Sequence, residues 1–156
     1  WQNIKKTNKN LKLHMVGKIQ SNKAKNAFEI FDFIHSLDNQ KLADIFSKCE
    51  VTNKRKINYF IQVNIGNEIQ KSGVPVREVD SFYDYCVKER NLNIIGLMII
   101  PPNDNKTKKY FKTIDELNSS LGLQEISMGM SSDYLDAINY NATYVRIGSS
   151  IFGSRS

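Results

Sequence analysis

Short apolar runs alternate with amphipathic stretches along almost the whole chain. The apolar runs, several of them rich in β-branched and aromatic residues, predict strands at 11–17, 31–37, 57–66, 91–100, 124–130 and 142–148. Apolar residues at helical spacing predict helices at 22–31, 39–51, 76–90, 107–122 and 131–141. Pro101 and Pro102 stop the fourth strand, and Gly122 supplies a C-cap signal for the fourth helix.

Regular alternation of strand and helix predicts a parallel sheet with helical crossovers. Two architectures fit, an open doubly wound sheet and a TIM-type (β/α)8 barrel. No G-x-G-x-x-G motif follows the first strand, which weakens the dinucleotide-binding version of the open sheet. Loops with glycine and serine instead follow the last two strands, where barrels commonly hold a phosphate. The α/β fold class is therefore predicted to be a barrel.

The strand count constrains this prediction. About six βα units are visible, whereas a closed barrel of this type needs eight strands. The last strand has the features of strand eight, because its loop runs directly into a short closing turn. We therefore expect the first two strands to lie before Trp1, and residues 1–156 to form a single domain that is the C-terminal portion of a longer barrel. The alternative is a small, intact open sheet of six strands.

Composition is that of an ordinary globular domain, with 40% hydrophobic and 24% charged residues among 156. No apolar run approaches the roughly 18 residues of a membrane span, so we expect no membrane association. The two cysteines, Cys49 and Cys86, lack metal-ligand spacing. They predict a protein of the reducing cytoplasm without a metal site.

The formal net charge is +6, and lysine supplies most of the positive residues. Seven lysines precede the first acidic residue, Glu29. Such a surface is compatible with nucleic-acid binding, but no aromatic-rich or other nucleic-acid motif accompanies it. A basic surface beside an anionic ligand site has the same composition. We expect no nucleic-acid partner.

The last strand contains an arginine, Arg146, within an apolar run. Because side chains alternate along a strand, Tyr144, Arg146 and Gly148 should face the barrel interior, and Val145 and Ile147 the outer helices. A buried guanidinium needs a partner.

That partner is either an acid on a neighbouring strand or a ligand. Segments 91–100 and 142–148 contain no acid, which leaves Glu125 as the nearest candidate for an ion pair. The ligand role is favoured.

Two donor-rich loops follow consecutive strands, residues 129–133 and 148–150. Both offer backbone N–H groups and serine hydroxyls, and the first opens a helix, whose N-terminal N–H groups lack intrahelical partners. Together they predict a cup for a phosphate monoester. The alternative is that Ser131 or Ser132 only caps the helix.

The motifs ISMGMSSD (126–133) and YVRIGSSIFG (144–153) closely resemble signatures of the pyridoxal 5′-phosphate (PLP) homeostasis proteins, the YggS/PROSC family. The same holds for HMVGKIQSNKAK (14–25), IHSLDNQKLA (34–43), QVNIGNEIQKSG (62–73) and GLMIIPP (96–102). The resemblance covers nearly the whole chain, in order. It implies a fold like the N-terminal barrel of alanine racemase, known as fold type III.

The resemblance also implies PLP as the cofactor and a role for several residues. Arg146 would face the pyridine nitrogen. Gly148 and Ser149 would hold the phosphate, with help from the loop of Met130 and Ser131. The remaining residues implied near the cofactor are Asn22 in the SNK motif, Met98 and His14 at the barrel mouth, and Lys71 in a nearby loop.

The family resemblance implies a non-catalytic carrier that buffers PLP inside the cell and supplies PLP-dependent apo-enzymes, monomeric in its full-length form. The chemistry of arginine agrees, because a guanidinium only donates hydrogen bonds and leaves the ring nitrogen unprotonated, which makes the ring a poor electron sink. The alternatives are a fold type III enzyme acting on amino acids and a phosphate-binding barrel enzyme unrelated to PLP. No carboxylate pair or metal cluster at the strand ends supports the latter.

The chain departs from the family at one point. The family links PLP to a lysine in a V-S-K-like motif near the end of its first strand, and no such motif is present. Lys12 lies too early in its strand, Lys18 follows another strand, and Lys54 and Lys56 belong at the opposite end of the barrel. We expect the linking lysine to precede Trp1, so that this chain would bind PLP weakly and without a covalent link. His35 is interpreted as packed or hydrogen-bonded, and Asp38 as a helix N-cap.

Overall fold

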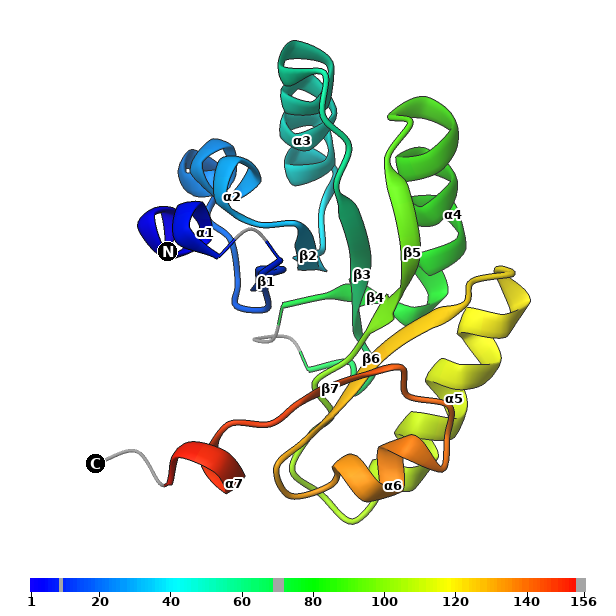
Figure 1. Ribbon diagram of the computed structural model, residues 1–156. Helices are drawn as coiled ribbons and strands as arrows, with labels where there is room; N and C mark the ends of the chain where they lie inside the picture. Colours follow the sequence, from blue (N-terminus) through cyan, green and yellow to red (C-terminus); the bar gives the residue numbers. More distant parts are fainter. Residues whose placement is uncertain (9, 69–71, 154–156) are drawn as a thin grey trace.

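The computed structural model describes residues 1–8, 10–68 and 72–153, which form a parallel sheet with helices on its outer side (Figure 1). The strands pair in the order β1-β2-β3-β5-β6-β7, and the short β4 pairs with β3 beside this path. Their bounds are β1 (His14–Met15), β2 (Phe33–Leu37), β3 (Asn58–Asn64), β4 (Val74–Pro75), β5 (Asn93–Met98), β6 (Glu125–Met130) and β7 (Tyr144–Arg146).

The spatial order of the main strands is the order of the chain, without the reversal that defines a doubly wound sheet. The sheet curls into part of a (β/α) barrel, which confirms the predicted fold class. In the described residues β1 and β7 share no backbone pairing, but their side chains approach across the interior. The rings of His14 and Tyr144 are 5.7 Å apart, centroid to centroid. β4 was not predicted, because a strand of two residues is too short to show an alternation of apolar and polar positions.

Each predicted helix has a counterpart, and all helices except the first and the last lie between successive strands. They are α1 (Gln2–Thr7), η1 (Ser21–Lys23), α2 (Ala24–Ile30), α3 (Gln40–Asn53), η2 (Val76–Glu78), α4 (Val79–Asp84), η3 (Tyr85–Glu89), α5 (Thr107–Ser120), α6 (Tyr134–Ile138) and α7 (Ser149–Phe152). The third predicted helix is divided among η2, α4 and the π-helical η3. None of the helices among the described residues combines the length and hydropathy that crossing a membrane requires.

The main hydrophobic core lies between the outer face of the sheet and the helices. β3 contributes Tyr59, Ile61 and Val63, while Phe46 of α3 and Phe111 of α5 cover them and their neighbours. All five side chains are buried, Phe46 and Phe111 completely. Removing a side chain of this size from water stabilises the fold by about 1.5–3 kcal/mol. The core therefore fixes the curvature on which the inner face depends.

Two helix ends show how local sequence sets the boundaries. Asn39, and not Asp38 as predicted, is the N-cap of α3, because its Oδ1 accepts a hydrogen bond from the Leu42 N–H at 3.0 Å. Asp38 instead accepts a hydrogen bond from the Asn39 side chain. At the end of α5, Gly122 adopts the left-handed conformation with φ of 69°, as its C-cap signal predicted.

A buried acid holds the end of the barrel that lies opposite the strand C-termini. Glu50 accepts hydrogen bonds from the Ile57 N–H and the Tyr59 hydroxyl, both at 3.2 Å, and its other oxygen lies 2.7 Å from Lys56 Nζ. Burial, followed by the charge of Glu50, raises the pKa of Tyr59. Lys56 lies two residues before the start of β3, so its predicted place at this end is confirmed. The role of Glu50 was not predicted, since a glutamate within an amphipathic helix normally faces solvent.

Helix α1, absent from the prediction, is joined to the body of the protein by an ion pair. Lys5 Nζ lies 2.8 Å from the carboxylate of Asp32, which also accepts a hydrogen bond from the Leu13 N–H. Arg55 adds a second cation at 3.3 Å and donates to the carbonyl oxygens of Phe28 and Phe31 at the end of α2. Burial opposes ionisation of Asp32, but these hydrogen bonds and charges lower its pKa.

Candidate functional site

The inner face of the sheet carries a different set of side chains from the outer face. Strand alternation directs Phe60 of β3, Ser127 of β6 and Arg146 of β7 to the inside, where they meet His35 of β2 and His14 of β1. Five strands thus contribute to one cluster. It holds polar and aromatic groups rather than the aliphatic residues of the outer core.

Arg146 donates two hydrogen bonds from its guanidinium. Nη1 lies 2.8 Å from Ser127 Oγ, and Nη2 lies 2.8 Å from the carbonyl oxygen of Ile99. Burial lowers the pKa of Arg146 to about 10, partly offset by the charge of Asp133, so the side chain remains a cation near neutral pH. Among the described residues no carboxylate lies within ion-pair distance of Arg146. The alternative of an ion pair with Glu125 is therefore wrong.

A hydrogen-bonded chain continues from Ser127 across the interior. Ser127 Oγ lies 2.8 Å from His35 Nδ1, and His35 Nε2 lies 2.9 Å from His14 Nδ1. Burial, with repulsion from His14 and Arg146, lowers the pKa of His35 to about 3. Burial also lowers the pKa of His14, against the charge of Asp32. Both imidazoles are therefore neutral near neutral pH. His35 is packed and hydrogen-bonded, as predicted.

Aromatic rings hold both imidazoles in place. His14 stacks on Phe33 with 4.1 Å between centroids, and His35 stacks on Phe60 with 4.3 Å. Tyr144 of β7 packs against both histidines and both phenylalanines. The predicted inward direction of Tyr144 and Arg146 is thereby confirmed. Val145 faces outward, but it is 38% exposed rather than covered by a helix.

A hollow of about 450 Å³ lies beside this cluster. Its walls are formed by β1, β2, β7 and the residues that follow β1 and β7. The lining residues are His14, Val16, His35, Tyr144, Val145, Arg146, Ile147 and Gly148. Positive charge comes from Arg146 alone within this lining, and no lysine belongs to it. A hollow of this size with one cation suits a small anionic or hydrogen-bond-accepting ligand.

The two serine-bearing loops meet in space, as the cup prediction requires. The backbone N–H of Gly148 donates to Ser131 Oγ at 3.2 Å, and that of Ser150 donates to the same oxygen at 3.4 Å. The Ser150 hydroxyl lies 3.5 Å from the Ser131 carbonyl oxygen. Two N–H groups from one loop thus converge on an oxygen from the other. The Ser131 hydroxyl stands where an anionic oxygen would accept both hydrogen bonds.

The turn that presents Ser131 depends on a glycine and an aspartate. Gly129 has a φ of 90°, and a Cβ at this position would lie 2.7 Å from the Cβ of Ala137 in α6. Asp133 Oδ1 accepts a hydrogen bond from the Met130 N–H at 2.6 Å. α6 therefore begins at Tyr134, later than predicted, and Ser131 lies in the turn before it. The alternative that Ser131 caps the helix is wrong, since the N-cap residue is Asp133.

The remaining residues predicted near the cofactor are more scattered. Met98 is completely buried in the barrel and is not part of the lining of the hollow. Asn22 is exposed in η1, outside that lining, and Ser149 is exposed as the first residue of α7. Met130 ends β6 next to the cup. Lys71 lies outside the described residues.

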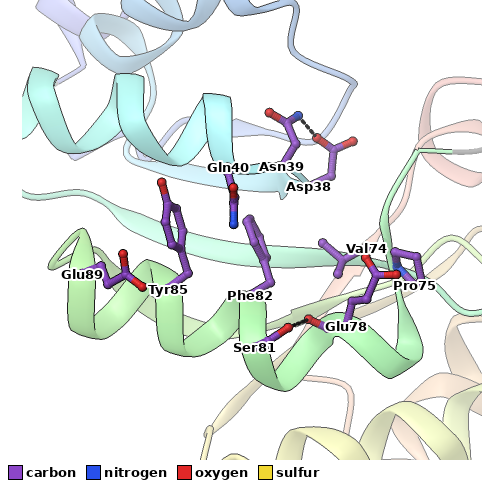
Figure 2. A pocket seen from close by; sticks show the side chains of 10 residues that line it. All are labelled: Asp38, Asn39, Gln40, Val74, Pro75, Glu78, Ser81, Phe82, Tyr85 and Glu89. Carbon is purple, nitrogen blue, oxygen red and sulfur yellow. Dashed lines mark hydrogen bonds between the residues drawn. The ribbon is translucent and has the colours of Figure 1, made fainter.

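A second cavity, of about 370 Å³, lies between the start of α3 and helix α4 (Figure 2). Its lining includes the carboxylates of Asp38, Glu78 and Glu89, and no lysine or arginine. The charge of this groove disfavours a phosphate. Within the described residues no group of histidine, cysteine and acidic side chains could hold a metal ion, and both cysteines are free and buried. The hollow at β1 and β7 is the candidate site because it brings Arg146 next to the two donor-rich loops.

Comparison with known proteins gives a consistent result at the level of sequence. A family model described as alanine racemase, N-terminal domain, matches residues 3–156. The pyridoxal phosphate homeostasis protein of Aquifex aeolicus is 37% identical over 154 residues, covering 93% of this chain and 68% of that protein. The protein of the same name from Haemophilus influenzae is 38% identical over 157 residues, covering 94% of this chain and 66% of its own length. The chain thus spans about two thirds of these relatives.

Solved structures agree with the sequence comparison. PipY of Synechococcus elongatus, solved with PLP bound, superposes with a TM-score of 0.87 at 30% identity and covers 97% of this chain and 75% of that one. Alanine racemase from Corynebacterium glutamicum shares the fold at a TM-score of 0.70 and 13% identity, covering 99% of this chain and 44% of the racemase.

Proposed function

Because this chain belongs to the family of the alanine racemase N-terminal domain, and within it to the pyridoxal phosphate homeostasis proteins, we propose that it binds PLP and serves PLP homeostasis. One observation carries the proposal. Arg146, a cation that has no carboxylate partner among the described residues, faces the same hollow that the Gly148 loop adjoins, and that loop meets the Ser131 loop in a cup of hydrogen-bond donors.

The residues present fit the cofactor at its phosphate end. Gly148, Ser149 and Ser150 begin a short helix, and the N–H groups of Gly148 and Ser150 already donate to an oxygen atom, that of the Ser131 hydroxyl. A phosphate oxygen accepts the same kind of hydrogen bond, with a negative charge that strengthens it. Gly148 has open space around it and brings its N–H close to a ligand without a side chain in the way. These residues would hold the phosphate, with Met130 next to them.

Arg146 would meet the ring. PLP, when bound, supplies an aldehyde carbon and a pyridine ring that can withdraw electrons. The guanidinium donates hydrogen bonds and accepts none, so at the pyridine nitrogen it would leave that nitrogen without a proton and weaken the electron withdrawal. This supports a carrier that is not a catalyst. Binding without a covalent link is part of the same proposal.

The wider role follows from the relatives named for PLP homeostasis. The chain would store PLP and release it to PLP-dependent apo-enzymes in the cytoplasm, without nucleic acid or membrane partners. A monomeric full-length protein and a single domain that forms the C-terminal portion of a barrel belong to the same proposal. That Asn22 and Met98 lie near the bound cofactor remains a prediction.

Titration of the chain with PLP, followed by absorbance and by dialysis, tests the proposal. Arg146→Glu places a carboxylate opposite the ring nitrogen and should weaken binding tenfold or more, equivalent to about 1.4 kcal/mol. Arg146→Lys, which keeps the charge but not the planar donors, serves as the matched control and should lie between the two. Equal retention by all three proteins contradicts the assignment of Arg146 to the site.

The two remaining parts of the proposal need separate assays. Borohydride treatment of the chain loaded with one equivalent of PLP should leave no single lysine labelled in preference to the exposed ones, and a stoichiometric adduct at one lysine found by peptide mass spectrometry contradicts binding without a link. Racemisation of amino acids by the loaded chain should stay at the rate of free PLP. Turnover above that rate makes the chain a fold type III enzyme instead.

A further inference from the structure

Arg146, Ser127, His35 and His14 form one continuous chain of hydrogen bonds that spans the barrel interior. Its three links measure 2.8 Å, 2.8 Å and 2.9 Å. Binding of the ring nitrogen requires only Arg146, so the three other residues have no role in the function proposed above. Their arrangement therefore calls for its own explanation.

The cation at one end determines the direction of the first two hydrogen bonds. A guanidinium can only donate, so Ser127 Oγ accepts from Arg146 Nη1. The hydroxyl has one proton of its own, and within the described residues its other partner is His35 Nδ1. Ser127 therefore donates to His35, and Nδ1 of His35 is the acceptor.

The direction then passes through both imidazoles. A neutral imidazole has one donor and one acceptor nitrogen, so an acceptor at His35 Nδ1 places its proton on Nε2. That Nε2–H donates to His14 Nδ1, and the proton of His14 is in turn placed on Nε2. Both rings are clamped by stacking on Phe33 and Phe60, which keeps their nitrogens in register.

The charges around the chain keep the imidazoles neutral. His35 is 2% exposed and lies between His14 and the Arg146 cation, so a proton on it would be both desolvated and repelled. His14 is desolvated too, with Asp32 as the one acid that favours its protonation. Asp133 near Arg146 and Glu125 near Tyr144 are the other acids whose charges act on this cluster.

The last donor of the chain is available to a ligand. His14 lines the hollow, and its Nε2 has no hydrogen-bond partner among the described residues. Resting on the function proposed above, we propose that Arg146, acting through Ser127 and His35, sets His14 as a hydrogen-bond donor to the aldehyde oxygen of the ligand.

The ligand chemistry follows from this assignment. PLP carries a phenolate oxygen and an aldehyde oxygen on its ring, both of which accept hydrogen bonds. Pyridoxamine phosphate shares the phenolate oxygen but has an ammonium group in place of the aldehyde, so only a donor that meets the aldehyde oxygen distinguishes the two compounds. With His14 at the aldehyde oxygen the site selects the aldehyde form, while Ser127 and His35 act as positioning residues because both of their hydrogen bonds in this chain go to other protein groups.

The tautomers can be measured without any ligand. Long-range ¹H–¹⁵N NMR spectra of the wild-type chain should show both histidines neutral, with the proton on Nε2. A proton on Nδ1 of either histidine overturns the proposed direction. Ser127→Ala removes the link and should leave His35 as a mixture of tautomers, whereas Ser127→Thr retains a hydroxyl and should restore Nε2–H. Unchanged tautomers in Ser127→Ala overturn the role of Ser127; far-ultraviolet circular dichroism checks the fold of both variants.

Ligand selection is measured by titration with PLP and with pyridoxamine phosphate. His14→Phe keeps the stack on Phe33 and removes the donor, so it should weaken PLP binding about tenfold and pyridoxamine phosphate binding much less. An unchanged ratio of the two affinities overturns the selective role of His14. If the wild-type chain binds neither compound, the proposed function and the selective role both fail, while the tautomer measurement still decides the direction of the chain.

Discussion

The two faces of the sheet differ in what holds them together. The outer face, against the helices, is a continuous apolar core that includes Ile61 and Phe111. The inner face joins Arg146, Ser127, His35 and His14 by hydrogen bonds between side chains from strands far apart in the chain. The outer face gains its stability from removing apolar area from water, and this contribution tolerates exchanges between apolar side chains of similar volume. The inner face depends on directed contacts, in which each member needs its neighbour.

Truncation of the outer core should have the largest effect on stability. Phe111 is completely buried between α5 and the sheet, and Phe111→Ala should lower the free energy of unfolding by about 3–5 kcal/mol, through lost burial and the cavity that remains. Urea denaturation followed by circular dichroism measures this loss. Val51→Ala, at a position that is 78% exposed, is the control and should change it by less than about 0.5 kcal/mol. Similar losses in the two variants contradict the assignment of the core to the outer face.

The inner face should instead be sensitive to pH. Burial, with repulsion from His14 and Arg146, lowers the pKa of His35 from 6.5 to about 3, so the unfolded chain takes up a proton there more readily than the folded chain. The stability that this residue provides is complete above about pH 6.5 and is lost as the pH falls toward 3. Between about pH 7 and pH 4 the loss should approach 3 kcal/mol.

Comparison with a variant isolates this contribution, because carboxylates also titrate in the range. Urea denaturation of wild type and His35→Gln across that pH range should show a steeper decline for wild type. The difference between the two slopes belongs to His35. Parallel declines indicate that the inner face contributes no pH dependence through this residue.

The smallest effect on stability is expected at the rim of the inner face. The Ser131 hydroxyl is held by two N–H groups at 3.2 Å and 3.4 Å, long hydrogen bonds at an exposed position. Ser131→Ala should change the free energy of unfolding by less than about 0.5 kcal/mol and tighten PLP binding about threefold, because the N–H groups of Gly148 and Ser150 lose the internal acceptor that a phosphate has to displace. Ser132→Ala, the exposed neighbour, should change neither quantity. Weaker binding in Ser132→Ala alone places the phosphate elsewhere.

The two faces also differ in how far the sequence predicted them. Apolar periodicity placed the strand that carries both Phe60 and Ile61 and the helix that carries Phe111, because burial between the sheet and the helices requires apolar residues at those spacings. Alternation also placed Arg146 correctly on the inside. The same alternation in the segments 31–37 and 124–130 puts His35 and Ser127 on the inner face, a signal that could have identified them.

Other features needed the folded chain. The contact between His35 and Ser127 joins residues 92 positions apart, and it depends on the register of four strands, which no local pattern specifies. Two ion pairs were also not predicted from the sequence. They join Lys5 to Asp32 and Lys56 to the buried Glu50. The sequence alone does not show which oppositely charged residue a charged side chain will pair with, or whether the pair will be buried.

The Ser131 hydroxyl within the donor cup affects how readily a ligand could come and go. When no anion is bound, the N–H groups of Gly148 and Ser150 donate their hydrogen bonds to Ser131 Oγ, an acceptor of the protein itself. An arriving phosphate exchanges with that oxygen, and on departure the oxygen can return. The chain with a bound phosphate and the chain without one then differ less in free energy than they would if the two N–H groups had no acceptor in the empty site. This favours release of PLP over its permanent retention.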